Sequence, residues 1–507
     1  MSNELIINVT SKEKRVAFLE SGAVTELYYE RSKPLGYAGN IYKGKVQRVL
    51  PGMQAAFVEL GLEKAAFLYS GDIAEELRHL DTGDDGSEGG SGNGKQRRQF
   101  DPYASIEHKL RPGQEIIVQV VRGPIGTKGA RITSHITLPG RYLVYMPYWD
   151  RIGISKKVSQ DQERRRLRQL LKAHRPEYGG LIVRTAAEGI ADDEIVQDLQ
   201  LLKDEWQKII DTANEVKAPA LVQTEIDIVL KAIRDFLSVG IDRVMVDDVA
   251  EHEKIQKFIE RYIPSWHGQL ELYKDDTPIF DFYGIEAEIN RALGKKVWLK
   301  SGGYIIIEQT EALSTIDVNT GRFVGTTSLE DTILKTNMEA VEEIVYQLRL
   351  RNMGGIIILD FIDMEKRSSR EKVYRYLQDK LSEDRARTTI SKITDLGLIE
   401  MTRKRTHESL TRILTDECPV CDGRGFLKSA TTVCYEIFRQ ILREFRHEEC
   451  KKLILTVYPT AFGALEGEEH EGFIELQRIV GKEIQLKLDS SFHPEQYEII
   501  PVYERVE

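Results

Sequence analysis

The segments STIDVN (residues 314–319) and GGIIILDF (residues 354–361) decide the fold of the central part of the chain. Both are short, apolar and rich in β-branched residues, which is typical of buried strands. The residues between them, at about 328–351, have the pattern of a long helix. A strand, a helix and a second strand in this order form a βαβ-like unit, in which the two strands can lie side by side. We therefore expect an α/β sheet in this region.

An aspartate lies at the end of each of these two strands, Asp317 in the first and Asp360 in the second. Ligand groups gather at the carboxyl ends of strands in α/β sheets, and two converging carboxylates repel each other unless a cation lies between them. Mg²⁺ binds one or two carboxylates and keeps waters for a substrate phosphate. Asn319 falls on the same face as Asp317 and can orient a carboxylate or contact that phosphate. The spacing thus predicts a magnesium site, although aspartates at strand ends are also common caps.

The earlier part of the chain changes character twice. Residues 1–35 and 38–78 contain short strands separated by small turns, which is typical of a barrel or a sandwich. Residues 81–95, DTGDDGSEGGSGNGK, have almost nothing to bury and predict a flexible surface insertion within this β region. From Pro139 onward, strands alternate with amphipathic helices.

Length and composition restrict the class of protein. A chain of 507 residues is too long for one core, so we expect two to four domains. No apolar run approaches the length of a membrane span, and the N-terminus lacks the basic start and apolar block of a signal peptide, which predicts a cytoplasmic location. The net charge of −10 argues mildly against a nucleic-acid partner. A basic groove can nevertheless exist on an acidic protein.

The sequence CPVCDGRG, residues 418–425, predicts a zinc site. Two cysteines separated by two residues and followed by glycine turns form a knuckle that presents two thiolates to Zn²⁺. A structural zinc needs four ligands, and the other two cysteines are isolated in the sequence. The simplest completion is the same pair, Cys418 and Cys421, from a second chain, which predicts a homodimer.

Two further groups of residues are candidates for binding RNA. Phe57 and Phe67 lie on adjacent predicted strands with Lys43 nearby, and aromatic side chains on a small barrel flanked by cations can stack single-stranded bases. Arg184 and Thr185 end the predicted strand GLIV and form a plausible phosphate clamp. The alternatives are that both phenylalanines belong to the core and that Arg184 forms a surface salt bridge.

Taken together, the sequence resembles the ribonuclease E/G family of endoribonucleases. The matching stretches are GNIYKGKVQRVLPGMQAAFVELG, GLIVRTAAEG, TEALSTIDVNTGR, NMEAVEEIVYQLRLRNMGGIIILDFIDM and CPVCDGRG, which lie in this order between about residues 36 and 425. No large C-terminal scaffold follows, so the chain is more similar to the G type of the family than to the full-length E type.

The resemblance implies a multidomain α/β architecture with two domains inserted into a third. The implied segments are 1–35 and 229–292 (ribonuclease-H-like domain), 36–132 (S1, OB-type RNA-binding domain, with the flexible insertion at 81–100), 133–228 (5′-sensor domain), 293–415 (DNase-I-like catalytic domain), 416–425 (zinc link) and 426–507 (small C-terminal α/β domain).

The resemblance also implies roles for particular residues. Asp317 and Asp360 hold the catalytic Mg²⁺, with Mn²⁺ as an alternative ion, and Asn319 supports them. RNA is held by Phe57, Phe67 and Lys128. A 5′-monophosphate is bound by Arg184, Thr185 and the backbone amides of Gly140 and Val144, with Arg387 near that pocket. Lys156 departs from the pattern, because the E-type enzymes have an arginine there.

The function expected from the sequence is therefore that of a magnesium-dependent hydrolase that cuts single-stranded RNA. The expected products carry 5′-phosphate and 3′-hydroxyl ends, and a 5′-monophosphate on the substrate stimulates cleavage. The resemblance implies roles in rRNA processing and mRNA decay, and a dimer or tetramer that shares zinc. The alternative is a non-catalytic S1-type RNA-binding protein, which has no use for two converging carboxylates.

Overall fold

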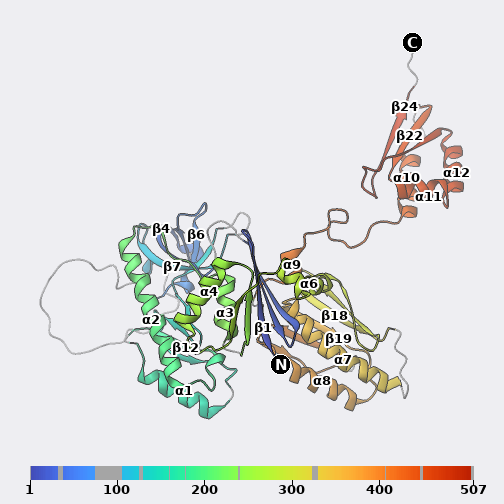
Figure 1. Ribbon diagram of the computed structural model, residues 1–507. Coiled ribbons are helices and arrows are strands. Elements are labelled where there is room, and N and C mark those ends of the chain that lie inside the picture. The colour runs from blue at the N-terminus through green and yellow to red at the C-terminus, as the bar shows by residue number, and fades with distance from the viewer. Residues whose placement is uncertain are drawn as a thin grey trace. The chain divides into compact units, whose positions relative to one another are not determined.

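The chain forms two compact units, residues 1–413 and residues 414–507. The Gly-rich segment at 81–95 and Lys128 lie outside the residues that the computed structural model describes (Figure 1). The described residues are 2–31, 38–74, 106–124, 129–158, 160–176, 178–237, 240–321, 329–394, 396–405, 407–445 and 449–503.

The first sheet of the larger unit joins the N-terminal strands to strands far later in the chain. Its five strands have the order β15-β14-β1-β2-β3, and β1 pairs in parallel with β14. Helices α3 and α4 pack on it through Ile233 and Ile255, which contact the core around Leu5 and Val16. The elements are β1 (Asn3–Val9), β2 (Glu13–Glu20), β3 (Ala23–Arg31), α3 (Ile228–Phe236), β14 (Arg243–Val246), α4 (Val249–Tyr262), β15 (Gln269–Leu272), α5 (Ile279–Phe282) and α6 (Ile285–Leu293).

The second sheet closes into the barrel that the strand pattern predicts. Five strands follow one another in the order β4-β5-β6-β8-β7, and pairing of β4 with β7 closes the ring, which is consistent with an S1 or OB-type domain. The strands are β4 (Ile41–Leu50), β5 (Ala55–Glu59), β6 (Ala66–Tyr69), β7 (Glu115–Arg122) and β8 (Arg131–Thr133). A further strand, β13 (Ala220–Gln223), pairs with β4 although it comes from the segment expected to form the next domain.

The third sheet has four strands in the order β11-β12-β10-β9. Its core includes Leu143 and Leu181 from the sheet and Leu167 and Leu199 from two helices. The elements are β9 (Leu138–Pro139), β10 (Leu143–Met146), β11 (Ile152–Ile154), α1 (Asp161–Ala173), β12 (Gly180–Val183) and α2 (Asp192–Glu215).

The fourth sheet contains the two strands predicted at residues 314–319 and 354–361. Its six strands have the order β16-β17-β18-β19-β21-β20, and β18 and β19 are parallel neighbours, as the βαβ pattern predicts. Helices α7 and α8 pack against the face that carries Ile316 and Leu359 (Figure 1). The elements are β16 (Lys296–Trp298), β17 (Tyr304–Gln309), β18 (Leu313–Asn319), α7 (Leu329–Leu350), β19 (Gly355–Asp360), α8 (Arg367–Ser382), β20 (Thr388–Ile390) and β21 (Leu398–Arg403).

The smaller unit has its own three-stranded sheet in the order β23-β22-β24, with a separate apolar core around Ile437 and Leu455. After the short helix α9 (Leu410–Leu414), its elements are α10 (Ala430–Glu444), β22 (Lys452–Val457), α11 (Pro459–Glu466), α12 (His470–Val480), β23 (Glu483–Leu488) and β24 (Tyr497–Val502). Across the described parts of both units, none of the helices combines the length and the apolar character that crossing a lipid bilayer requires.

Candidate active site

The two predicted carboxylates lie side by side on the outer face of the fourth sheet. Asp317 in β18 is the direct parallel partner of Asp360 in β19, and both are exposed. Neighbouring strands are about 4.8 Å apart, so the two side chains leave the sheet next to each other. The inner face of the same strands is buried against α7 and α8, which fixes the register and therefore the pairing of the two aspartates.

This pair carries negative charge that the surrounding protein compensates only in part. The Asn319 Nδ2 donates a hydrogen bond of 2.8 Å to Asp317 Oδ2. Partial burial, together with the charges of Asp317 and Asp363, raises the pKa of Asp360. An ion between the two carboxylates would relieve this repulsion. Since two carboxylates supply few ligands, they suit a cation that keeps several waters, as Mg²⁺ does.

An aromatic strip lies on the barrel, where the sequence predicted that two phenylalanines occupy adjacent strands. Phe57 and Phe67 are direct partners on β5 and β6, and their ring centroids are 5.6 Å apart. The ring of Tyr69, which is 45% exposed, continues the strip at 4.4 Å from Phe67. The guanidinium of Arg131 lies over Tyr69 at 5.1 Å. Tyr69 falls two residues after Phe67 and was visible in the strand period, whereas Arg131 comes from a distant strand and gave no signal.

Lys43 is tied into the protein itself. Its Nζ donates a hydrogen bond to the Val216 carbonyl at 3.0 Å and forms an ion pair with Glu115 at 2.9 Å. The hydrogen bond from Lys43 lowers the pKa of the Glu115 carboxyl. The structure thus gives Lys43 a role in joining the barrel to the end of α2, and its contact with RNA stays a prediction.

Arg184 and Thr185 line a groove of about 1010 Å³ in the larger unit. The Arg184 Nη1 donates to the Gly140 carbonyl at 2.7 Å and to Asp235 Oδ1 at 2.9 Å, while the Thr185 hydroxyl lies 3.0 Å from the Ser155 hydroxyl. The predicted clamp residues therefore share one concave surface, and Arg184 is already oriented by two acceptors.

The remaining residues of the predicted phosphate pocket have different surroundings. The Gly140 N–H donates to the Leu143 carbonyl at 2.8 Å, so it is the carbonyl of Gly140 that contacts Arg184. Val144 belongs to β10 and is the direct partner of both Ile182 and Pro139.

The same groove is lined by two basic residues, Lys157 and Arg385, that the sequence analysis did not assign to it. Arg387 is exposed, and Arg385, two residues earlier, lines the groove with its guanidinium 4.0 Å from the Phe236 ring centroid. The Lys157 ammonium also lines it and donates to the carbonyls of Asp384 and Arg385 at 2.9 and 2.8 Å. Lys157, Arg184 and Arg385 come from three separate segments of the sequence, so no single motif could have predicted that they line one groove.

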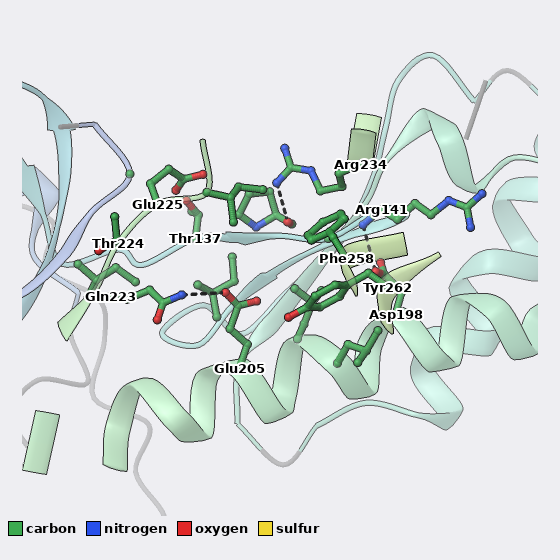
Figure 2. Close-up of a pocket in the computed structure, with 18 of the residues that line it drawn as sticks. Thr137, Arg141, Asp198, Glu205, Gln223, Thr224, Glu225, Arg234, Phe258 and Tyr262 are labelled. Atoms are coloured by element: carbon green, nitrogen blue, oxygen red, sulfur yellow. Dashed lines mark hydrogen bonds between the residues drawn. The ribbon is translucent and has the colours of Figure 1, made fainter. Parts of the chain in front are cut away.

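A smaller cavity of about 80 Å³ is lined by Gly140 and shares Arg234 with this groove. Figure 2 shows Arg141, Asp198 and Arg234 around this cavity. The Asp198 carboxylate accepts hydrogen bonds from the amides of Arg141, Tyr142 and Leu143 at 2.9–3.0 Å. Arg234 Nη1 donates to the Pro139 carbonyl at 2.9 Å. These contacts hold the turn that carries Gly140, and through it they position Arg184.

Cys418 and Cys421, in the smaller unit, are both reduced and form one tight turn. The Gly425 N–H donates to Cys421 Sγ at 3.4 Å, and the backbone N–H of Cys421 lowers the pKa of the Cys418 thiol. Gly423 and Gly425 have φ angles of 75° and 79°, which favour glycine. Within the described ranges, no group of three or more His, Cys, Asp or Glu side chains gathers as a complete metal site.

Paired carboxylates on an open sheet, an aromatic strip on a small barrel and a groove that contains Arg184, Lys157 and Arg385 are the features of an enzyme that acts on a phosphate-bearing polymer. The Ribonuclease E/G family model matches residues 137–406. Ribonuclease G of Salmonella typhimurium and of Escherichia coli K12 are each 43% identical over 500 residues, 99% of this chain and 100% of theirs. Ribonuclease E of a Nostoc species is 39% identical over 391 residues, 76% of this chain and 54% of its own. The chain therefore belongs to the ribonuclease E/G family and is an endoribonuclease.

The roles of Phe67 and Lys43 can be separated by substitution. We expect Phe67→Ala to weaken binding of a short single-stranded RNA by about 1–3 kcal/mol, since a stacked base loses its partner. Lys43→Met should change RNA affinity by less than this but should lower the free energy of unfolding, because Glu115 and the Val216 carbonyl lose their donor. Fluorescence anisotropy and urea denaturation measure the two effects, and a larger affinity loss for Lys43→Met than for Phe67→Ala would contradict the assignment.

Proposed function

We propose that this endoribonuclease hydrolyses single-stranded RNA at a site where Asp317 and Asp360 hold one Mg²⁺, with Mn²⁺ as an alternative ion. The observation that carries the proposal is the direct pairing of these two aspartates on neighbouring parallel strands. When bound, the ion would stabilise charge on the scissile phosphate and make a water more acidic. The products would be a 5′-phosphate and a 3′-hydroxyl end.

The chain's own residues prepare this site before the substrate arrives. Asn319 donates to one oxygen of Asp317 and so restricts the rotation of the carboxylate, which leaves the other oxygen for the ion. Partial burial raises the pKa of Asp360, and the charges of Asp317 and Asp363 raise it further; a bound cation would offset the repulsion between these carboxylates. The strip of Phe57, Phe67 and Tyr69 would hold unpaired bases by stacking, which selects single strands because bases in a duplex have no free face.

The groove around Arg184 is proposed to bind the 5′-monophosphate of the substrate. The Arg184 guanidinium is held by the Gly140 carbonyl and Asp235, and Thr185 and Ser155 supply hydroxyl groups beside it. Arginine has a fork of donors that matches phosphate oxygens, so it is suited to this ligand. The nearby cations Lys157 and Arg385 would strengthen the attraction to an anion.

The cysteine knuckle is proposed to bind half of a zinc site that a second chain completes. Cys418 and Cys421 lie in one turn, and the backbone hydrogen bonds to the Cys418 sulfur lower the pKa of that thiol, which favours the thiolate form that zinc requires. Two such knuckles give four thiolates and a homodimer, and pairing of dimers would give a tetramer. We further propose that the enzyme acts in the cytoplasm in rRNA processing and mRNA decay.

Replacing Asp317 tests the catalytic proposal. We expect Asp317→Asn to slow cleavage of a labelled single strand by more than about 100-fold, since groups that only orient metal ligands already contribute 10–100-fold. Asn319→Ala should lower the cleavage rate less than Asp317→Asn does. RNA affinity should stay within a few-fold of the unmodified protein. The matched control is Asp281→Asn, an exposed aspartate on α5, and retained turnover in Asp317→Asn would refute the proposal.

The phosphate groove predicts a preference for one 5′ end. A 5′-monophosphorylated oligonucleotide should be cut faster than its 5′-hydroxyl twin. Arg184→Gln should bring the two rates together while leaving the rate on the 5′-hydroxyl substrate nearly unchanged. Arg387→Gln and Arg385→Gln, compared in the same assay, decide which arginine contributes. Equal rates on both substrates with the unmodified protein would remove this groove from the account.

The zinc proposal predicts a stoichiometry. Metal analysis should give about half a zinc per chain if four thiolates from two chains share one ion. A strong chelator, or Cys418→Ser, should remove the metal and convert the dimer to monomers in light scattering. Cys434→Ser, at a buried cysteine in α10, is the control and should keep the metal. One zinc per chain would show a site closed within the chain and would contradict the shared site.

A further inference from the structure

An exposed aromatic platform, made of Lys296, Trp298 and Tyr304, lies on the outer strands β16 and β17 of the fourth sheet. Trp298 is 62% exposed, and its ring centroid lies 5.4 Å from that of Tyr304. The Lys296 ammonium lies over both rings, 4.1 Å from the centroid of Trp298 and 3.6 Å from that of Tyr304. The two rings meet edge to face at an interplanar angle of 68°, and the cation lies over both of them.

The strand register aligns this platform with the carboxylate pair. Trp298 is the direct partner of Tyr304, and Tyr304 is the direct partner of Asn319. In the next row, Lys296 pairs with Ile306, which pairs with Asp317. Direct partners in a sheet point to the same face, and neighbouring strands are about 4.8 Å apart. Trp298 therefore lies on the same face as the aspartates, about 10 Å from Asn319, a distance that a strand of one or two nucleotides can span.

A purely structural role explains this arrangement poorly. A cross-strand aromatic pair stabilises a sheet edge by only about 0.2–1 kcal/mol, and a smaller or less exposed pair would serve equally well. The inward side chains of the same strands, including Ile305 and Ile307, already belong to the apolar core. The nearest strand carboxylate on β17, Glu308, is paired with Lys295 at 3.1 Å. The charge of Lys296 beside the rings is therefore well placed for an anion.

We propose that Lys296, Trp298 and Tyr304 form a base-stacking subsite for the RNA strand next to the scissile phosphate. Trp298, the more exposed ring, would stack one base, Tyr304 would hold the Trp298 ring in place from the side, and Lys296 would face the phosphate of the same nucleotide. Every base has a π face, so the subsite accepts any base and favours the larger purine rings. The inference rests on the proposed function of Asp317 and Asp360. It adds three residues that would hold the RNA strand across these two aspartates.

The first test measures base contact without cleavage. In Asp317→Asn, a short single strand should quench part of the tryptophan fluorescence, and Asp317→Asn/Trp298→Phe should lose that part. Trp149→Phe, which replaces a second exposed tryptophan (43% exposed), is the matched control and should keep it. Quenching that survives the loss of Trp298 overturns the subsite.

The second test pairs the protein variant with a missing base. Substrates with a single abasic nucleotide at each position near the cut are compared by kcat/KM. At one position the loss of the base should cost the unmodified enzyme about 5-fold or more, and it should cost Trp298→Ala almost nothing. Trp298→Phe should restore most of the difference, because phenylalanine retains a stacking face. A Trp298→Ala effect that is equal for all substrates, or a change of oligomeric state in light scattering, overturns the subsite in favour of a fold or self-association role.

The two proposals fail in different ways. If Asp317→Asn still cleaves RNA, the catalytic assignment is wrong whatever the fluorescence does. If Asp317→Asn is inactive but Trp298 makes no difference to quenching or to the abasic penalty, the subsite alone is wrong and the catalytic pair stands.

Discussion

The electrostatic repulsion between Asp317 and Asp360 is the constraint on which the site depends. The fold makes the two aspartates direct partners on parallel strands, and the buried inner face of those strands prevents either one from moving away. Partial burial and, after it, the charge of Asp317 raise the pKa of Asp360. A sheet would be more stable without this pair, so its presence on a well-packed scaffold indicates that the charge serves function.

In the proposed function, the rest of the larger unit binds the parts of an RNA strand that are not being cut. The barrel would offer rings for bases and the groove around Arg184 would offer donors for a terminal phosphate, while the outer strands β16 and β17 continue the carboxylate face with aromatic side chains. The side chains of each surface lie on a strand or turn whose opposite face is buried. The barrel and the fourth sheet thus share a division between inward apolar residues and outward candidate residues.

Local patterns in the sequence predicted much of this structure. The βαβ pairing of β18 with β19 and the pairing of Phe57 with Phe67 follow from periodicity and short connections. The partners of Lys43 and the contribution of Lys157 and Arg385 to the groove could not be predicted, because they depend on segments that meet only in the folded chain. The pairing of β13 with β4 of the barrel could not be predicted for the same reason, since β13 comes from the segment expected to form the next domain.

Binding of Mn²⁺, followed by the relaxation of water protons, tests most directly whether the two aspartates share one ion. The measurement uses protein with Cys418→Ser/Cys421→Ser, so that thiolates do not compete for the metal. If the two aspartates share one ion, Asp317→Asn and Asp360→Asn should each abolish binding of the same single Mn²⁺, and combining them should have no further effect. Retention of one bound ion by either single variant, with a further loss in the double variant, would show separate sites and contradict the central claim.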